Sequence, residues 1–360
     1  MRREIKRVAE EMSAEAEDLA ADGKPGEILA RAEARLYAVA PKGPSDRQIM
    51  TAADAATQAI TEMNEAYQRG DGLAGISTGL KDLDEKIGGL PASNLIVAAG
   101  RPGMGKSVLA INIAQHIAST GRKVAFFSLE MAPSQLSQRM LAAAVAGGKG
   151  NAFKQMTGRV SEADIAAVME AERRIRDNLK RILIDHTPGV PIGTMHARAR
   201  RLHRLHDLGL IVVDYLQLMQ GAGPYGRTEN RVAEVTQITN GLKAMANEFS
   251  VPVLALSQLN RKVEERDDKR PVVSDLRDSG SIEQDADTVL LLYREEEYVS
   301  KAKPSPTSDT YEADYADWSQ RLERCTGKAE IIVGKSRHGP GGSVELSFDA
   351  PTQTFRDLAK

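Results

Sequence analysis

One short segment of the chain has the residue types and spacing of a phosphate-binding loop. It comprises Gly100, Arg101, Pro102, Gly103, Met104, Gly105, Lys106 and Ser107, and it fits the pattern G-x-x-x-x-G-K-[ST]. Such glycines let backbone N–H groups curl around phosphate oxygens, and the following helix adds the positive end of its dipole. The pattern assigns Lys106 to the β and γ phosphates and the Ser107 hydroxyl to Mg²⁺. A chance Gly-rich turn is the alternative, and the candidate strand before and helix after the loop argue against it.

Three polar side chains end apolar runs that read as strands. Asp214 ends Leu-Ile-Val-Val-Asp, at the strand edge where ligands bind in open α/β sheets, and could hold Mg²⁺ through a water. Glu130 could orient and deprotonate an attacking water, or it could only complement the dipole of the next helix. Gln258 could sense a γ-phosphate. Each is weak alone, because an Asp often only opens a turn and a single Gln indicates little.

The elements that must position these residues follow from an alternation of short apolar runs and helical stretches after Leu73. The expected strands are Asn94–Ala99, Lys123–Leu129, Ile182–Asp185, Leu210–Asp214, Pro252–Ser257, Thr288–Tyr293 and Glu330–Lys335. The expected crossover helices are Lys106–Thr120, Pro133–Ala146, Ser161–Asn178 and Pro191–Leu208. Runs that are apolar throughout suit central strands of a mostly parallel sheet, so the fold class is α/β. Residues 330–348 read as a hairpin around Gly339.

The first 70 residues have a different composition, rich in Ala, Glu and Arg. An apolar stripe at helical spacing predicts a short amphipathic helix over about residues 27–40. The stripe is Ile28, Leu29, Ala32, Leu36 and Val39. A second helical stretch runs over 45–69, and Gly70-Asp71-Gly72 reads as a hinge. We therefore expect a helical region over 1–70 and a main domain over 71–360, with an exposed insertion at about 299–328.

Composition excludes several classes of protein. The 360 residues carry a net charge of −2 and are 41% hydrophobic, so the chain is neither disordered nor a polycation. No apolar run reaches the roughly 18 residues of a membrane span, and no signal peptide opens the chain. The single cysteine, Cys325, forms no internal disulfide, which favours a reducing cytoplasm.

Several sequence blocks, taken in order, identify a family. They are GRPGMGKS, FFSLEM, LIVVDYLQLM, GRTENR, LALSQLNRKVEERDDKRPVVSDLRDSGSIEQDAD and AEIIVGKSRHGPGG. Together they resemble a replicative DNA helicase of the DnaB type over roughly residues 73–360, and residues 27–40 resemble its linker helix. The resemblance implies a RecA-like P-loop ATPase core that uses ATP and Mg²⁺. It also implies a homohexameric ring that moves 5′→3′ on single-stranded DNA and unwinds duplex at the replication fork.

The resemblance also assigns roles to individual residues. Lys106 and Ser107 would bind ATP and Mg²⁺, Asp214 would be the Walker B residue, Glu130 the catalytic base and Gln258 the γ-phosphate sensor. Lys335 and Arg337 match a basic pair that acts on a neighbouring subunit, with Arg337 as the arginine finger. Arg277, Asp278 and Gly280 match a DNA-contacting loop, in which the family usually has Glu at position 278. Further partners implied are primase and a helicase loader, and most of the family's N-terminal domain is absent from this sequence.

Two segments are further candidates for DNA contact. Residues 260–270 mix basic and acidic side chains, so on charge alone they read as a solvated loop. Residues 260–284 contain no aromatic residue, so DNA held there would be bound through phosphates and not by stacking. The Gly-rich segment 221–227 is a second candidate, or else a simple connection.

Two other functions fit parts of the pattern. A RecA-like recombination or repair ATPase would form filaments on DNA, but the linker-helix pattern and the GKSRHG hairpin favour a ring. An inactive DNA-binding scaffold would not need Lys106, Glu130, Asp214 and Arg337, all of which are present.

Overall fold

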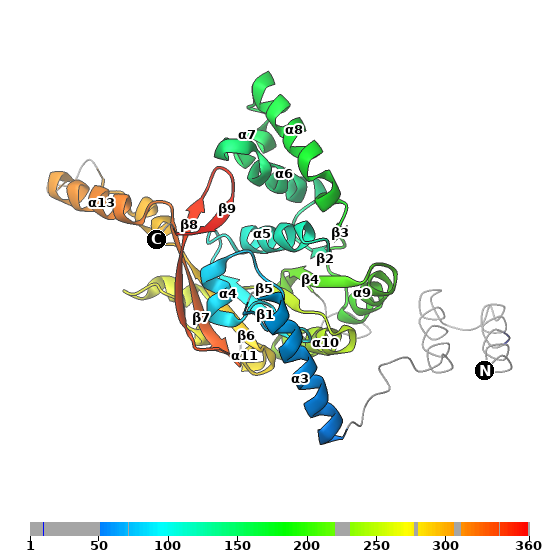
Figure 1. The fold of residues 1–360 in the computed structure, drawn as a ribbon. Coiled ribbons are helices and arrows are strands. Elements are labelled where there is room, and N and C mark those ends of the chain that lie inside the picture. The colour runs from blue at the N-terminus through cyan, green and yellow to red at the C-terminus, as the bar shows by residue number, and fades with distance from the viewer. Residues whose placement is uncertain are drawn as a thin grey trace, which may run out of the picture. The chain divides into compact units, whose positions relative to one another are not determined.

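The computed structural model describes Glu10 and residues 51–70, 72–219, 231–276, 280–305, 311–337 and 339–358 (Figure 1). The chain divides into two units, Met1–Glu62 and Met63–Lys360. Helix α3 (Ala52–Arg69) spans this division and lies within the second expected helical stretch. The linker helix expected over 27–40 lies outside the described residues, and the domain boundary near residue 70 stays a prediction.

A single mixed sheet forms the centre of the second unit. In the described part of the chain its order is β3-β2-β4-β5-β1-β6-β7-β8-β9. Its strands are β1 (Leu95–Gly100), β2 (Lys123–Ser128), β3 (Ile182–Asp185), β4 (Leu208–Asp214), β5 (Val253–Gln258), β6 (Thr288–Tyr293), β7 (Lys328–Ser336), β8 (Gly342–Asp349) and β9 (Thr354–Asp357). Strands β1 to β6 run parallel, and β7, β8 and β9 continue the sheet in antiparallel pairing. The RecA-like, mostly parallel α/β core is therefore confirmed.

The central strands are apolar throughout because helices cover both faces of the sheet. Successive residues of β1 point to opposite sides. Ile96 and Ala98 join one core cluster with helices α4 (Lys81–Ile87) and α5 (Lys106–Ser119). Leu95, Val97 and Ala99 join the other cluster with helices α9 (Ile192–His206) and α10 (Arg231–Phe249). Every residue of β1 is buried. This strand therefore holds its last residue, Gly100, firmly at the centre of one sheet edge.

Helices connect most of the parallel strands, and further helices precede β1 or lie between β6 and β7 (Figure 1). They are α4 (Lys81–Ile87), α5 (Lys106–Ser119), α6 (Pro133–Ala144), α7 (Ala152–Thr157), α8 (Glu162–Leu179), α9 (Ile192–His206), α10 (Arg231–Phe249), α11 (Gly280–Asp285), α12 (Glu295–Val299) and α13 (Tyr311–Cys325). Ser161 caps α8: its hydroxyl accepts the N–H of Asp164 at 3.1 Å, and the Asp164 carboxylate accepts the N–H of Ser161 at 2.9 Å. None of the described helices is long and apolar enough to cross a membrane.

The structure differs from the expected elements mainly at chain connections. Each expected strand and crossover helix is present with ends shifted by at most a few residues. Strand β9 and helices α4, α7, α11 and α12 were not expected, because they are only four to seven residues long and carry little periodicity. The longer helices α10 and α13 were not among the expected helices either. The expected insertion holds α13, whose Trp318 donates to the Val299 carbonyl oxygen at 2.7 Å. The helix is thereby fastened to the end of α12.

Candidate nucleotide site

The loop between β1 and α5 adopts the conformation that its glycines predict. Gly103 and Gly105 have φ values of +87° and +91°, a region that other residues rarely adopt. A Cβ atom at Gly103 would lie 2.7 Å from the Glu297 carboxylate, and one at Gly105 would lie 2.9 Å from the Phe355 ring. Both positions therefore favour glycine for conformation, and Gly105 also for space, because the buried Phe355 ring cannot easily move aside. The loop ends at Lys106, the first residue of α5.

A cavity of about 400 Å³ opens beside this loop. It is lined by Pro102, Gly103, Gly105, Lys106, Ser107, Val108, Glu130, Met131, Arg139, Asp214, Tyr215, Gln258, Arg294, Phe348, Ala350 and Gln353. The expected residues Lys106, Ser107, Glu130, Asp214 and Gln258 all line it, although they come from four separate parts of the chain. Parallel strands bring them together, because their carboxyl ends meet at one sheet edge.

The charges in the cavity are poorly solvated. Burial lowers the pKa of Lys106 to about 8, although the nearby carboxylates of Asp214 and Glu130 favour its charged form. Burial raises the pKa of Asp214, and a hydrogen bond with the Ser107 hydroxyl opposes that rise. A buried cation at the start of a helix is well suited to phosphate, which would supply the missing negative charge.

The Ser107 and Asp214 side chains fit a divalent cation. Asp214 is only 1% exposed, and its Oδ2 atom has no hydrogen-bond partner among the described residues. A buried carboxylate oxygen is costly unless it is paired or coordinates a metal. Hydroxyl and carboxylate oxygens are the ligands that Mg²⁺ prefers, so these two side chains would hold it beside the phosphates.

Glu130 and Gln258 approach the cavity from the two strands that flank β4. The Leu129 N–H donates to the Asp214 carbonyl oxygen at 2.7 Å, which places Glu130 next to the end of β4. Glu130 is exposed and precedes α6, which begins only at Pro133. Gln258 is the last residue of β5 and lies opposite Gly100. Its N–H donates to the Gln217 side chain at 3.2 Å, so the strand end is held in place.

Three residues of the expected loop do not line the cavity. Gly100 and Met104 belong to the packed interior around the loop. The Arg101 side chain is buried and turns away, with Nη1 donating to the Leu259 carbonyl oxygen at 2.9 Å and Nε pairing with Glu264 at 2.8 Å. Arg101 therefore ties the phosphate loop to the segment after β5.

Two cavity arginines were missed by the sequence reasoning. Arg139, on α6, is half-buried, and its Nε atom has no partner among the described residues. Burial lowers its pKa, whereas Asp214 and Glu130 favour its charge. Arg294 donates to the Gly103 carbonyl oxygen at 3.0 Å and lies 4.0 Å from the centre of the Phe348 ring. In the sequence Arg139 looks like any polar residue of a helix. Arg294 directly follows a strand, but many residues do, so its position alone does not predict a role at the site.

Lys335 and Arg337 lie at the other end of the central strands from the cavity. Thr288, at the start of β6, pairs with Ile96 near the start of β1 and with Ser336 at the end of β7. The phosphate loop follows the other end of β1. At about 3.3 Å per residue, the two ends are roughly 13 Å apart along the strand. The basic pair is therefore not part of the cavity that Lys106 lines.

Comparison with known proteins identifies the family of the chain. Residues 75–357 match the DnaB-like helicase C terminal domain. The chain is 38% identical to the replicative DNA helicase DnaB of Rickettsia bellii, an alignment that covers 99% of this chain and 72% of that protein. The chain belongs to the DnaB family of replicative DNA helicases. The matched DnaB-like range contains all the described strands, β1 to β9.

Solved structures share the fold. A DnaB-like replicative helicase whose interactions with primase were studied matches with a TM-score of 0.75 and 28% identity, over 99% of this chain and 76% of that chain. A solved ATPase domain matches with a TM-score of 0.69 and 31% identity, over 84% of this chain and 98% of that chain. The nucleotide-binding core of this DnaB-family chain is thus of the RecA-like ATPase type.

The basic residues of 260–270 are largely engaged within the chain. Arg266 pairs with Asp275 at 2.6 Å, and Arg270 pairs with Glu330 at 2.9 Å. Lys269 donates to two backbone carbonyls of its own loop. These pairs favour the solvated-loop interpretation over DNA contact. Of the DnaB-type DNA loop, Gly280 begins α11, whereas Arg277, Asp278 and the segment 221–227 lie outside the described residues.

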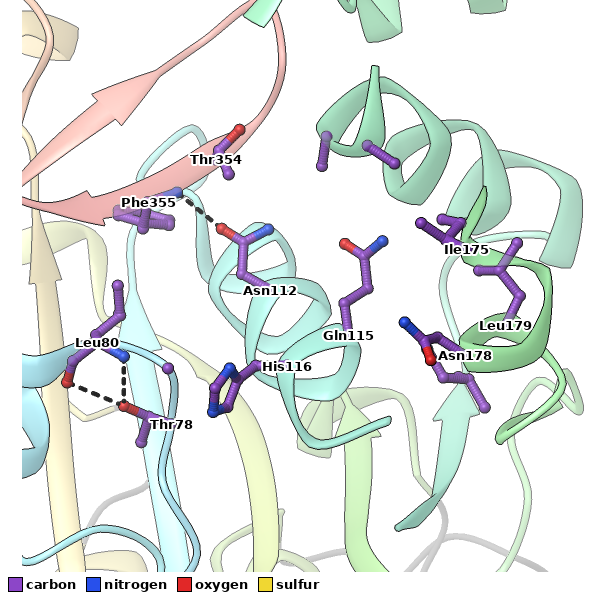
Figure 2. A pocket seen from close by; sticks show the side chains of 14 residues that line it. Thr78, Leu80, Asn112, Gln115, His116, Ile175, Asn178, Leu179, Thr354 and Phe355 are labelled. Atoms are coloured by element: carbon purple, nitrogen blue, oxygen red, sulfur yellow. Dashed lines mark hydrogen bonds between the residues drawn. The ribbon is translucent and has the colours of Figure 1, made fainter. Parts of the chain in front are cut away.

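A second cavity, of about 310 Å³, lies between α5, α8 and β9 (Figure 2). Its amide side chains serve the fold: Asn112 accepts the Phe355 N–H at 2.7 Å, and Gln115 donates to the Met140 carbonyl oxygen at 3.1 Å. These bonds fasten β9 and α6 to α5. The cavity is a packing junction, and the nucleotide chemistry is assigned to the cavity that Lys106 lines.

Proposed function

We propose that the chain is an ATP-driven, ring-forming DNA helicase that forms homohexamers and moves 5′→3′ on single-stranded DNA. Lys106 would bind the phosphates, and Ser107 and Asp214 would hold Mg²⁺, which neutralises phosphate charge when bound. The exposed Glu130 carboxylate can accept a proton from the attacking water, and Gln258 can contact the γ-phosphate. Work at the replication fork also implies a cytoplasmic protein.

One observation carries the ring proposal. Lys335 and Arg337 lie at one end of the paired strands β1, β6 and β7, and the phosphate loop lies at the other end. Arg337 is separated from its own phosphate loop by most of the strand length. Its side chain is 49% exposed and so remains accessible to another molecule. A guanidinium that stabilises developing phosphate charge must touch that phosphate. Arg337 can meet this requirement if its exposed side chain reaches the nucleotide of a neighbouring subunit.

The segment after Gln258 offers a route from nucleotide to DNA. Leu259 pairs with Leu276, and the Asn260 N–H donates to the Asp275 carbonyl oxygen at 2.8 Å. The intervening residues thus form a loop with a closed neck. One side of the neck follows the γ-phosphate sensor and the other leads directly to Arg277. We propose that movement of Gln258 shifts this neck and with it the DNA-contacting residues.

The ring also needs a surface that receives the linker helix. On α7 and α8, four large apolar side chains are exposed: Phe153, Met156, Ile165 and Met169. We propose that the linker stripe of the adjacent subunit, which includes Leu36, packs on this surface. Primase is a further partner, since a solved relative was studied with primase, and a helicase loader completes the proposed set.

Subunit mixing tests the proposal. Lys106→Ala and Arg337→Ala should each be nearly inactive as ATPases, the second because an arginine finger contributes roughly 10³–10⁵-fold in turnover. Mixed rings should regain hydrolysis, because some interfaces pair an intact Lys106 with a neighbour's intact Arg337. If subunit exchange is confirmed and no ratio restores activity, either the finger acts on its own subunit's nucleotide or isolated interfaces cannot fire alone. A covalently linked dimer that carries both defects in one subunit separates these outcomes, because it is active only if the finger acts on its own subunit. Mass measurement with nucleotide should give a closed hexamer and not an open-ended series.

A further inference from the structure

Asp287 is a buried carboxylate at the start of β6 that holds Arg337 twice. Its Oδ1 atom lies 3.1 Å from Arg337 Nη1, and its backbone carbonyl accepts the Arg337 N–H at 3.0 Å. The residue is only 2% exposed. The same amino acid therefore fixes both the backbone and the guanidinium of the proposed finger.

The other carboxylate oxygen of Asp287 makes contacts that do not involve the finger. Oδ2 accepts the Leu95 N–H at 2.7 Å and the Lys243 ammonium at 2.6 Å. Lys243 alone can therefore neutralise the buried carboxylate. Arg337 is therefore the second cation beside the Asp287 carboxylate, whose charge Lys243 already balances. The Arg337 guanidinium is half-exposed, so its other N–H groups can donate to another anion.

Lys335 is fastened to the same part of the chain. Its Nζ atom donates to the Gln284 carbonyl oxygen at 3.2 Å and also to that of Glu283. Both residues belong to the last turn of α11, just ahead of Asp287. The two basic side chains thus rest on residues 283–287. The Asp285 carboxylate attracts both of them, and Arg337 in addition forms an ion pair with Asp287.

We propose that Asp287 is the positioning residue for Arg337, fixing the guanidinium in the direction from which it meets a neighbouring subunit's γ-phosphate. This inference rests on the proposed function of Arg337. A long side chain that must reach across an interface loses rotational freedom on engagement, and an anchor formed in advance reduces that loss. The spare positive charge is what a phosphate needs, and the buried Asp287–Lys243 pair makes the anchor rigid.

Asp287→Asn tests the inference, because asparagine has the same shape and keeps an oxygen that can accept the Leu95 N–H. ATP turnover with saturating oligo-dT should fall roughly 10- to 100-fold, with little change in KM for ATP, as expected when a reacting group is misplaced. Asp185→Asn is the matched control, because it breaks an Arg198–carboxylate pair of 2.9 Å on β3, away from the finger. Near-normal turnover in Asp287→Asn, or an equal loss in Asp185→Asn, would overturn the inference.

Complementation separates positioning from a structural role. Asp287→Asn subunits keep an intact Lys106, so mixing them with Lys106→Ala subunits should restore turnover through the latter's intact Asp287 and Arg337. Mixing them with Arg337→Ala subunits should restore none, since no interface then has an anchored finger. The reverse pattern would mean that Asp287 serves its own nucleotide through Leu95, and rescue by neither would indicate misfolding.

Two further measurements complete the test. If Asp287→Asn lowers the thermal midpoint so far that rings do not form, Asp287→Glu retains the charge for Lys243 while displacing the carboxylate, and should show the same complementation class. The mixture of Lys106→Ala with Arg337→Ala is the reference. If that mixture stays inactive while a linked dimer with both defects in one subunit is active, the proposed action on the neighbour fails. If the mixture recovers while Asp287→Asn behaves as wild type, only the positioning role fails.

Discussion

Lys106 Nζ donates a hydrogen bond of 2.8 Å to the carbonyl oxygen of Gly100, the last residue of the strand before the phosphate loop. The bond thus links the last lysine of the loop to the backbone at the start of the loop. The bond partly compensates an ammonium group whose pKa is lowered by burial to about 8. Phosphate oxygens can replace this carbonyl as a stronger, charged acceptor.

The first prediction separates phosphate binding from water activation. Lys106→Ala should lose ATP binding and turnover together, because it removes the buried cation. Glu130→Gln should bind ATP normally and lose about 10²–10⁴-fold in turnover, the usual contribution of a general base. Equilibrium binding of a fluorescent ATP analogue and steady-state hydrolysis measure the two effects. Near-normal turnover in Glu130→Gln would leave that carboxylate only a structural role.

The second prediction concerns the stability of nucleotide-free protein in EDTA. The pKa of Lys106 is lowered from 10.5 to about 8, chiefly by burial, so between these pH values the unfolded chain binds more protons. Stability relative to Lys106→Met should therefore rise with pH across that window. At pH 7 the lysine is charged in both states, its burial penalty is fully present, and Lys106→Met should melt at a higher temperature than wild type.

Melting curves at pH 7 and pH 9.5 measure this difference. Lys149→Met, at an exposed position, is the matched control and should not reproduce the pH dependence. A gap between wild type and Lys106→Met that is the same at both pH values would show that the ammonium group is well solvated.

The third prediction concerns single-stranded DNA. With no aromatic residue in 260–284, affinity should fall with salt by a log–log slope of about −0.7 per phosphate contacted. Arg277→Ala should weaken binding to all sequences alike and make the slope shallower by about 0.7. Fluorescence anisotropy with homopolymers of different base composition tests both expectations. A strong base preference with little salt effect would contradict phosphate tracking.

Arg270 provides the control for that experiment. It already pairs with Glu330 at 2.9 Å and lies over the Tyr293 ring at 6.0 Å. Arg270→Ala should therefore lower the thermal midpoint slightly and leave the salt slope unchanged. A loss of slope equal to that of Arg277→Ala would restore residues 260–270 as a DNA contact.

The fourth prediction concerns assembly. Leu36→Asp on the linker stripe and Met169→Asp on α8 should each dissociate rings, because a carboxylate cannot be buried in an apolar contact without a partner. Nucleotide binding by the separated subunits should persist. Leu205→Asp, at another exposed apolar position, on α9, should leave rings intact. Light scattering with nucleotide measures the mass, and a full ring with Leu36→Asp would mean that the stripe packs within its own chain.

The sequence predicted the parts of the fold in which local pattern and tertiary burial agree. Buried strands such as β4 have no charged residue before their last position, and the phosphate loop is specified by its own glycines. Strand β9 escaped prediction because its four residues are stabilised by pairing with β8 and by the Asn112 side chain, neither of which is a local property.

The site shows the same limit. Lys106, Ser107 and Asp214 could be found because strand ends and loop spacing place them at one edge. Arg139 could not, since only the packing of α6 brings its side chain beside Asp214. The distance between Arg337 and the phosphate loop could not be predicted either, because it depends on β7 pairing antiparallel to β6.

If Arg337 acts on a neighbour as proposed, that antiparallel pairing gives each subunit one end that supplies the guanidinium and another end that holds the nucleotide. Subunits that join one such end to the other meet through two different surfaces, a heterologous contact that produces either a closed ring or an open helix. An open chain always leaves one terminal nucleotide without a guanidinium and one terminal guanidinium without a nucleotide. In the proposed ring, closure would remove both defects at once, so every interface would pair one nucleotide with one guanidinium.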